Sequence, residues 1–384
     1  MVSIDAKTMA SIVGQFAFVD KNPIHLVFSG GEIRFEGSDG MRRLRRTIAI
    51  IGGPLVEERI AVDFKLLSKT VKALAGELSL IIDTGVCLKI NGKNDSQYKL
   101  ARVDIEPIVF TKPKGTFPIR SLLFRRGLEK TLPFVDSASS LRPSLTGIQI
   151  VGSEEKLVFN GSNGHLLSRY ECIAEGLENE FAIILPQEAA RLILSIKAET
   201  FDVLMIENRG IVLVFEDGIF ESAIIEEPFP EVNTLLVTYN AGAQNKIVTL
   251  IEKWREALGI VSLYSSHNSK AVDIYVSKDK VELRAEDEDF GGFAKQWYHE
   301  ESIAPEPSVL VRISGPYLSS VLSVIDTDKM VVRFTEQGKN SPVIFAPSDE
   351  VDENLIVLAM PMRIEQYEKE YAEAFASESE AVLA

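Results

Sequence analysis

The chain has 384 residues and a mass of 42.5 kDa. This is roughly two to three times the size of an ordinary single domain, so we expect more than one hydrophobic core. With 46% hydrophobic and 25% charged residues, its composition is that of a globular protein and excludes a disordered or fibrous chain. A net charge of -15 excludes a protein that binds nucleic acid over its whole surface, so any DNA contact must be local.

Neither a membrane span nor a secretion signal is expected from the pattern of apolar residues. The longest stretch without Asp, Glu, Lys or Arg covers residues 232–245, which is shorter than the roughly 18 apolar residues of a membrane helix. The amino-terminal residues lack a basic segment followed by an apolar block and a cleavage site. Cys87 and Cys172 are too few for a disulfide framework or a structural zinc site. We therefore expect buried, reduced thiols and a cytoplasmic protein.

An internal repeat organises the chain. Alternating apolar and polar residues, followed by turn-forming residues, begin at Glu32, at Lys156 and again at Lys280, each 124 residues after the one before. The pattern is typical of a half-buried strand that enters a tight turn, although the third copy lacks the glycines. The sequence therefore predicts three copies of one unit.

Each copy is predicted to contain a helix, strands, a second helix and further strands. In chain order, the predicted helices cover residues 6–18, 63–74, 120–132, 186–197, 245–258 and 314–325, and strands at 78–82, 201–206 and 330–334 follow every second helix. Turn-forming residues cluster at 111–115 and 240–243. These clusters place domains at 1–114, 115–241 and 242–364, followed by an acidic tail at 365–384.

Motifs for catalysis or for nucleotide and metal binding are missing. A phosphate-binding loop ending at Gly92-Lys93 would need glycine where Cys87 stands. None of the four histidines lies in the sequence context of a hydrolase triad, and the acidic run at 286–289 lacks the ligand spacing of a calcium loop. We expect no catalytic residue, no cofactor and no metal.

Basic side chains recur on the predicted helices. In helix 63–74, a turn of 100° per residue places Lys65, Lys69 and Lys72 together, opposite the apolar side chains. A solvated face explains any one such helix, whereas several together favour one electropositive surface that faces a phosphate backbone. Other basic residues on predicted helices are Arg125, Arg126, Lys130, Arg191, Lys197, Lys246 and Lys253. The arginine-rich segment 42–46 lies in a predicted strand, where we expect a solvated edge.

Several motifs, together with the repeat, resemble the bacterial DNA sliding clamps, the beta subunits of replicative DNA polymerases. They are Ser-Asn-Gly-His-Leu-Leu at 162–167, Pro-Phe-Pro-Glu at 228–231, Ser-Pro-Val-Ile-Phe-Ala-Pro at 341–347 and Met-Pro-Met-Arg-Ile at 360–364. The ending Met-Pro-Met-Arg is the most specific of them. In architecture the resemblance spans residues 1–364, and in motifs it is strong only after about residue 145.

The resemblance implies an α+β fold of the DNA clamp type. Three repeated domains, each a doubled unit of helix and strands, would place antiparallel sheets outside and helices along the hole of a ring. Two chains would close head to tail as a homodimer around duplex DNA. The implied function is that of a non-catalytic processivity factor, with the replicative polymerase, an ATP-dependent clamp loader and other proteins bearing clamp-binding peptides as partners. The alternative is a clamp-fold scaffold for protein interactions that does not tether DNA.

The resemblance also implies two sets of binding residues. The peptide groove would consist of Leu145, Ser162, Gly164, His165, Leu167, Pro230, Leu235, Tyr317, Val343, Met360, Pro361, Met362 and Arg363. The DNA contacts would come from Lys21, Lys65, Lys69, Lys72, Arg125, Arg126, Lys130, Arg142, Arg191, Lys197, Lys246 and Lys253.

Some positions depart from the family pattern. Leu166, Val232 and Ser314 stand where the family commonly has Arg, an aromatic residue and Asn, so we expect the groove to prefer a somewhat different peptide. The tail at 365–384, with six Glu and one Lys, is longer than usual. A frayed acidic tail is one interpretation. A helix that folds Tyr367, Tyr371 and Phe375 back over the groove is the other.

Overall fold

The computed structural model describes residues 2–362 except 55, 91–95, 113–115, 138–140, 154, 176, 178–179, 207–209, 243–244, 278–279, 288–289, 300–308, 335–340 and 349–353. Contacts between residues divide the chain into two units. The first contains residues up to 128, 147–157 and 172–227, and the second contains 129–146, 158–171 and the chain from 228 onward.

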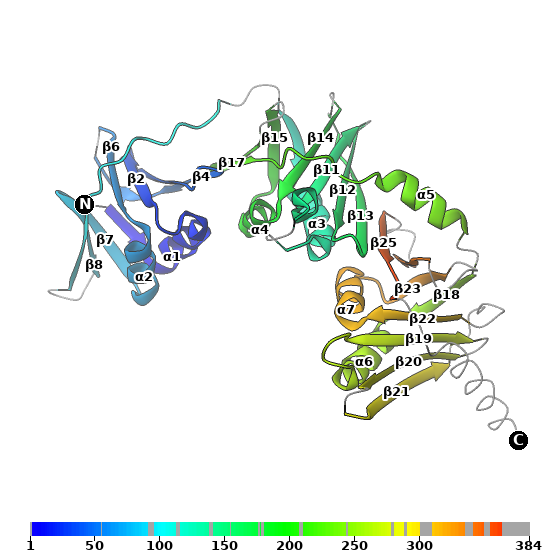
Figure 1. Ribbon diagram of the computed structural model, residues 1–384. Coiled ribbons are helices and arrows are strands. Elements are labelled where there is room, and N and C mark those ends of the chain that lie inside the picture. Colours follow the sequence, from blue (N-terminus) through cyan, green and yellow to red (C-terminus); the bar gives the residue numbers. More distant parts are fainter. Residues whose placement is uncertain are drawn as a thin grey trace, which may run out of the picture. The chain divides into compact units, whose positions relative to one another are not determined.

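Strands that lead directly into helices recur along the chain (Figure 1). These pairs are β1 (Val2–Asp5) with α1 (Ala6–Gln15), β6 (Glu58–Asp63) with α2 (Phe64–Ala73), β10 (Phe117–Arg120) with α3 (Ser121–Thr131), β14 (Phe181–Pro186) with α4 (Gln187–Ser195), β18 (Asn245–Leu250) with α6 (Ile251–Val261), and β22 (Val309–Ser314) with α7 (Gly315–Val324). The predicted alternation of helices and strands is therefore present.

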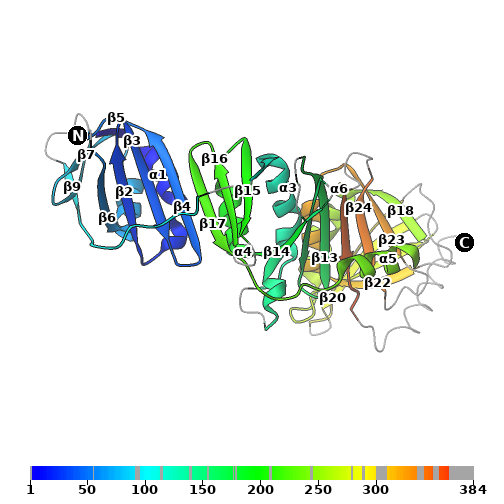
Figure 2. The same ribbon diagram turned by 90° about the horizontal axis from the view of Figure 1, so that it is seen from above.

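Antiparallel sheets build the first unit. One has the order β5-β1-β7-β8-β9 and the other β10-β15-β16-β17-β4-β3-β2-β6, while β11 pairs with β14. In Figure 2, β2, β3 and β4 lie side by side with α1 beneath them. The remaining strands of this unit are β2 (Pro23–Ser29), β3 (Glu32–Ser38), β4 (Arg42–Ala49), β5 (Ile51–Gly52), β7 (Glu77–Ile82), β8 (Gly85–Ile90), β9 (Gln97–Ala101), β11 (Gly147–Ser153), β15 (Thr200–Ile206), β16 (Gly210–Phe215) and β17 (Gly218–Ala223).

The second unit is also built from antiparallel strands. Its strands follow the order β12-β13-β25-β24-β23-β18 in one sheet and β21-β20-β19-β22 in another. They are β12 (Lys156–Ser162), β13 (Leu166–Ile173), β19 (Ala271–Ser277), β20 (Lys280–Asp287), β21 (Gly292–His299), β23 (Lys329–Phe334), β24 (Val343–Pro347) and β25 (Leu355–Ala359). Helix α6 contacts α7, β20 and β21. Another helix, α5 (Val232–Gly242), precedes β18.

Paired strands cross both predicted domain boundaries. β4 lies before residue 114 and pairs with β17, which lies after it. β13 lies before residue 241 and pairs with β25, which lies after it. Hydrogen-bonded seams therefore join neighbouring repeats, and the division into three domains stays a prediction.

Helix α2 shows how the sequence specifies an element locally. The Asp63 side chain accepts a hydrogen bond from the Leu66 backbone at 2.6 Å, which satisfies a free N–H group at the start of the helix. Phe64, Leu67 and Val71 recur at helical spacing and are buried. The lysines of this helix are exposed, as the spacing predicts.

The fifth predicted helix, 245–258, is wrong in its first half. Residues 245–250 form β18, in which Ile247 and Thr249 are buried while Lys246 is exposed. β18 pairs with β23, and this long-range partner decides between strand and helix in a short apolar run. Helix α5 has no counterpart among the predicted helices, and it covers part of the segment predicted as a turn at 240–243.

The arginine-rich segment 42–46 is not the solvated edge that the sequence predicts. β4 lies between β3 and β17, so it has a partner strand on both sides. Its guanidinium groups pair with carboxylates that come from other parts of the sheet and its turns. The pairs are Arg42 with Asp39 at 2.6 Å, Arg43 with Glu221 at 3.1 Å, Arg45 with Glu36 at 2.8 Å, and Arg46 with Asp217.

The two thiols lie in different environments. Cys172 is buried, and burial raises its pKa to about 12. Cys87 is partly exposed, so the prediction of buried thiols holds for Cys172 alone. Within the described ranges, no helix is long and apolar enough to cross a bilayer.

A buried histidine makes the stability of the fold dependent on pH. His25 is 1% exposed, and burial, with the nearby Arg59 guanidinium, lowers its pKa below the ordinary value of 6.5, although the Glu36 carboxylate opposes this. The unfolded chain therefore binds the proton at a higher pH than the folded chain. Stability is full above about pH 6.5 and falls as the pH drops towards the folded pKa.

Replacement of this histidine by a neutral side chain is expected to reduce that pH dependence. Between about pH 7.5 and pH 5.5, His25→Gln should lose less unfolding free energy than the wild type, by at most about 1.4 kcal/mol per pH unit. Urea denaturation at both pH values measures the difference, with the exposed His267→Gln as the control. Equal pH dependence of the wild type and His25→Gln would contradict this expectation.

Candidate peptide groove and basic helices

The turn between β12 and β13 is fixed by its own side chains. Ser162 Oγ accepts a hydrogen bond from Gly164 N at 3.1 Å and donates one to Leu166 O at 2.7 Å. Asn163 Oδ1 accepts bonds from His165 N at 2.9 Å and Leu166 N at 2.7 Å. The φ of Gly164 is +87°, a conformation that favours glycine. The turn therefore holds His165 and Leu166 in defined positions.

A cavity of about 340 Å³ lies beside this turn. Its walls come from the turn, from the segment before α5, from α5 itself and from the end of β25. The lining residues are Arg142, Leu145, Ser162, Gly164, His165, Leu166, Leu167, Phe229, Pro230, Val232, Leu235, Tyr239, Leu358 and Met360. The cavity lies wholly within the second unit.

Apolar packing positions α5 against the strands that form this cavity. Leu167 of β13, Leu358 of β25, Ile344 of β24 and Val232 of α5 form a buried cluster. Figure 1 shows α5 next to β13. Because α5 carries no charged side chain, it can lie on this apolar surface while one part of it, including the 41% exposed Leu235, faces the cavity.

Polar groups also lie at or beside the cavity. The Arg142 guanidinium lies so close to Gly164 that a Cβ atom there would meet Nη1 at 3.0 Å. The rings of His165 and Tyr317 stack with centroids 6.1 Å apart. Met360 N donates to His165 O at 2.8 Å, which ties the end of β25 to the turn. The described lining includes a guanidinium and no carboxylate.

The structure brings together many of the residues that the sequence assigns to a groove. Of that set, Leu145, Ser162, Gly164, His165, Leu167, Pro230, Leu235 and Met360 line the cavity. The others have different positions: Tyr317 stacks on His165, Val343 is buried, Pro361 and Met362 are partly buried, and Arg363 lies outside the described residues. The tail at 365–384, with Tyr367, Tyr371 and Phe375, also lies outside them.

Sequence reasoning missed several lining residues. Phe229, Val232, Tyr239 and Leu358 were absent from the predicted groove set, although Val232, like the lining residue Leu166, was noted as a departure that affects the groove, and Arg142 was assigned to DNA. The motif at 228–231 and the uncharged stretch from 232 contained a usable signal for the first three, because an uncharged helix must find an apolar surface. Nothing local marks Leu358 as a partner of the turn.

The predicted DNA contacts differ in exposure. Lys21, Lys65, Lys69, Lys72, Arg142, Arg191, Lys197 and Lys246 are exposed, whereas Arg125, Arg126 and Lys253 are partly buried. Lys65 pairs with Asp20 at 3.0 Å, and the Lys253 ammonium lies 5.1 Å from the centre of the Tyr298 ring. Lys246 lies on a strand, and not on a helix as predicted.

Lys130 does not face solvent. It is 4% exposed, and its Nζ donates to Val324 O and lies 2.5 Å from Asp326 Oδ2, at the end of α7. The sequence places Lys130 on a predicted helix with other basic residues, but the end of a neighbouring helix covers that position. The structure therefore contradicts the expectation that this lysine is free to meet a phosphate, and we leave it out of the basic surface below.

Comparisons with known proteins extend these observations. No family model matches the chain. The beta sliding clamp of Rickettsia bellii is 23% identical over 387 residues, which cover 94% of this chain and 99% of that protein. The beta sliding clamp of Staphylococcus aureus is 23% identical over 234 residues, covering 60% of this chain and 59% of that protein.

Solved structures match over nearly the whole chain. The DNA polymerase III subunit beta of Pseudomonas aeruginosa superposes with a TM-score of 0.83 at 17% identity, covering 95% of this chain and 100% of that one. The beta subunit from Thermotoga maritima gives a TM-score of 0.81 at 17% identity, with 95% and 99% covered.

The chain has antiparallel sheets, helices that follow strands at regular steps, and a small apolar cavity beside a fixed turn. These features define a protein with the α+β DNA clamp fold. The predicted fold class is confirmed. The chain is a homologue of the bacterial beta sliding clamps, and this relation extends over nearly its full length.

Proposed function

We infer that the protein is a processivity factor of DNA polymerase III: a non-catalytic clamp that encircles duplex DNA and tethers the polymerase. The observation that carries this inference is the relation to beta sliding clamps over 94% of the chain, combined with their fold. A cytoplasmic location is part of the proposal.

Local basic surfaces support DNA binding by an acidic protein. The net charge is -15, yet α2 presents Lys65, Lys69 and Lys72 to solvent and α4 presents Arg191. We propose that helices with such cations line the hole of a ring. Contacts to phosphate would then be weak, sensitive to salt and independent of sequence, which suits a clamp that slides.

The cavity beside α5 supports the binding of peptides from partner proteins. Its volume of about 340 Å³ and its Leu, Pro, Phe and Met side chains suit apolar anchors, and Arg142 can meet a carboxylate or a carbonyl. Leu166 and Val232 add apolar surface to the lining. We therefore propose a preference for more apolar peptides. The proposed occupants are peptides of the replicative polymerase, of an ATP-dependent clamp loader and of other clamp-binding proteins.

Terminal strands and exposed apolar side chains support closure of a homodimeric ring. β9 and β21 each lie at the end of a sheet. Tyr98 on β9 is 39% exposed, and a group near β21 is exposed to a similar or greater degree. This group consists of Ile260, Leu263, Tyr264, Phe290 and Phe293. We propose that β9 of one chain pairs with β21 of a second chain, which would satisfy both edges.

Small-angle X-ray scattering tests this assembly. We expect a mass of about 85 kDa, twice the 42.5 kDa of one chain, and a distance distribution with a central hole. Leu263→Asp should shift the protein towards a monomer, because a carboxylate would be buried at the interface. The exposed Ile173→Asp is the matched control. A compact monomer for the wild type would favour the scaffold alternative.

A further inference from the structure

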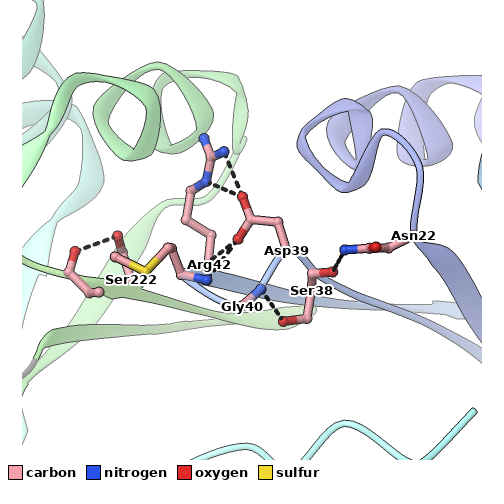
Figure 3. A network of polar contacts seen from close by, with 8 residues as sticks. Asn22, Ser38, Asp39, Gly40, Arg42 and Ser222 are labelled. Carbon is pink, nitrogen blue, oxygen red and sulfur yellow. Dashed lines mark hydrogen bonds and ion pairs between the residues drawn. The ribbon is translucent and has the colours of Figure 1, made fainter. Parts of the chain in front are cut away.

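The turn between β3 and β4 repeats the hydrogen bonds of the turn that builds the groove. Ser38 Oγ accepts from Gly40 N at 3.1 Å, and Asp39 Oδ1 accepts from Met41 N at 3.0 Å and Arg42 N at 2.6 Å (Figure 3). The φ of Gly40 is +93°, in the same left-handed region as the glycine of the groove turn. The two turns therefore share three hydrogen bonds from side chain to backbone and a left-handed glycine.

The strands that leave these turns also pair alike. On the seam between β4 and β17, Ala223 N donates to Met41 O at 2.9 Å. On the seam between β13 and β25, Met360 N donates to His165 O at 2.8 Å. His165 follows Met41 by 124 residues, which is the spacing of the repeat. The seam between β4 and β17 is thus the counterpart of the seam that carries the groove.

The chemistry at the centre of the two seams differs. Leu167 lies opposite Leu358 in the groove, whereas Arg43 lies opposite Glu221 in its counterpart. Glu221 is 6% exposed and pairs with the Arg43 guanidinium at 3.1 Å. Cavities of about 510 and 370 Å³ lie at this seam, and Arg43 and Thr111 line both of them. The counterpart site is therefore hollowed but polar.

A segment of the same chain, residues 107–111, lines the larger of these two cavities, and its Thr111 also lines the smaller one. We call it the strap. Arg43 Nη1 donates to Val109 O at 3.3 Å, and Thr111 N donates to the Glu221 carboxylate. The ion pair thus binds a carbonyl and an N–H group two residues apart, which is how an extended peptide backbone is recognised.

The strap also uses one of its side chains. The guanidinium of Arg45 lies 4.3 Å from the centre of the Phe110 ring, within the range of a cation–π contact. The Val109 side chain, next to it, is 78% exposed. Backbone recognition and a single aromatic anchor therefore hold the strap.

We propose that the strap is a built-in occupant of a second peptide-binding groove, at the seam between β4 and β17. Arg43 and Glu221 bind its backbone, and Arg45 binds its aromatic ring. The backbone-binding groups of this groove are occupied within the chain, so of these two seams the one between β13 and β25 is open to partner peptides, and each chain binds one such peptide there. The statement that each chain binds one partner peptide rests on the proposed function, whereas the occupancy of the groove by the strap does not.

Hydrogen exchange on the free, full-length protein tests the occupancy. We expect the Thr111 amide to be protected in the wild type, and Phe110→Ala to speed its exchange by about fivefold or more, the scale of one lost cation–π contact. Val109→Ala is the matched control from the same segment and should leave the rate unchanged, because only the carbonyl of Val109 is used. Glu221→Ala should remove the protection entirely.

Two results would overturn the proposal: a wild-type Thr111 amide that exchanges at the rate of an unprotected chain, or equal rates in Phe110→Ala and Val109→Ala. Because Glu221 is buried, the exchange rates of the β16 and β17 amides are measured in Glu221→Ala as well. Faster exchange of those amides would report loss of the sheet. The test uses neither DNA nor a partner, so its failure is distinct from failure of the clamp function.

Discussion

Reversing the charge of Lys65, Lys69 and Lys72 to Glu is expected to weaken association with duplex DNA strongly and to shorten the stretches that a tethered polymerase synthesises. These lysines are exposed on one face of α2. Each lost phosphate contact should lower the slope of log affinity against log salt by about 0.9, so the triple variant should lose close to three units of slope. Fluorescence anisotropy over a salt series measures this change.

A variant with the same change in net charge separates a local effect from a general one. Lys156, Lys270 and Lys329 are exposed and lie outside the predicted DNA contacts. Their replacement by Glu should change the salt slope little. If both triple variants behave alike, the basic face of α2 has no special role, and the alternative of a scaffold without DNA tethering gains support.

Placing a carboxylate in the groove is expected to weaken the binding of partner peptides strongly. Leu235 lines the cavity from α5, and Leu235→Asp would desolvate a charge against Leu and Phe side chains. The loss of an apolar anchor of about 2 to 4 kcal/mol corresponds to a fall in affinity of roughly 30-fold to 1000-fold. Titration with a peptide from a clamp-binding protein, followed by calorimetry, measures it.

Helix α5 supplies the matched control for this experiment. Val237 lies on the same helix, is 71% exposed and is not part of the cavity lining. Val237→Asp should therefore bind the peptide as the wild type does. An equal loss in both variants would indicate that the charge disturbs α5, and unchanged binding in Leu235→Asp would place the partner site elsewhere.

Local sequence patterns suffice to predict most of the helices and strands and about half of the residues that line the groove. Periodicity and capping residues act within a few positions, so helices such as α2 follow from the spacing of Phe64, Leu67 and Val71. The turn at 162–166 is likewise encoded by Ser162, Asn163 and Gly164, whose bonds are local. The repeat and the closing motifs were enough to indicate the clamp fold.

Residues distant in sequence determine the features that local patterns did not predict. β18 is a strand because β23 lies beside it, and Lys130 is buried because the end of α7 accepts its ammonium group. Arg43 looks like part of a free basic run, yet its guanidinium pairs with Glu221, 178 residues away, and donates to Val109 O. Burial and ion pairing depend on which segments the tertiary fold brings together, and spacing along a single segment does not contain that information.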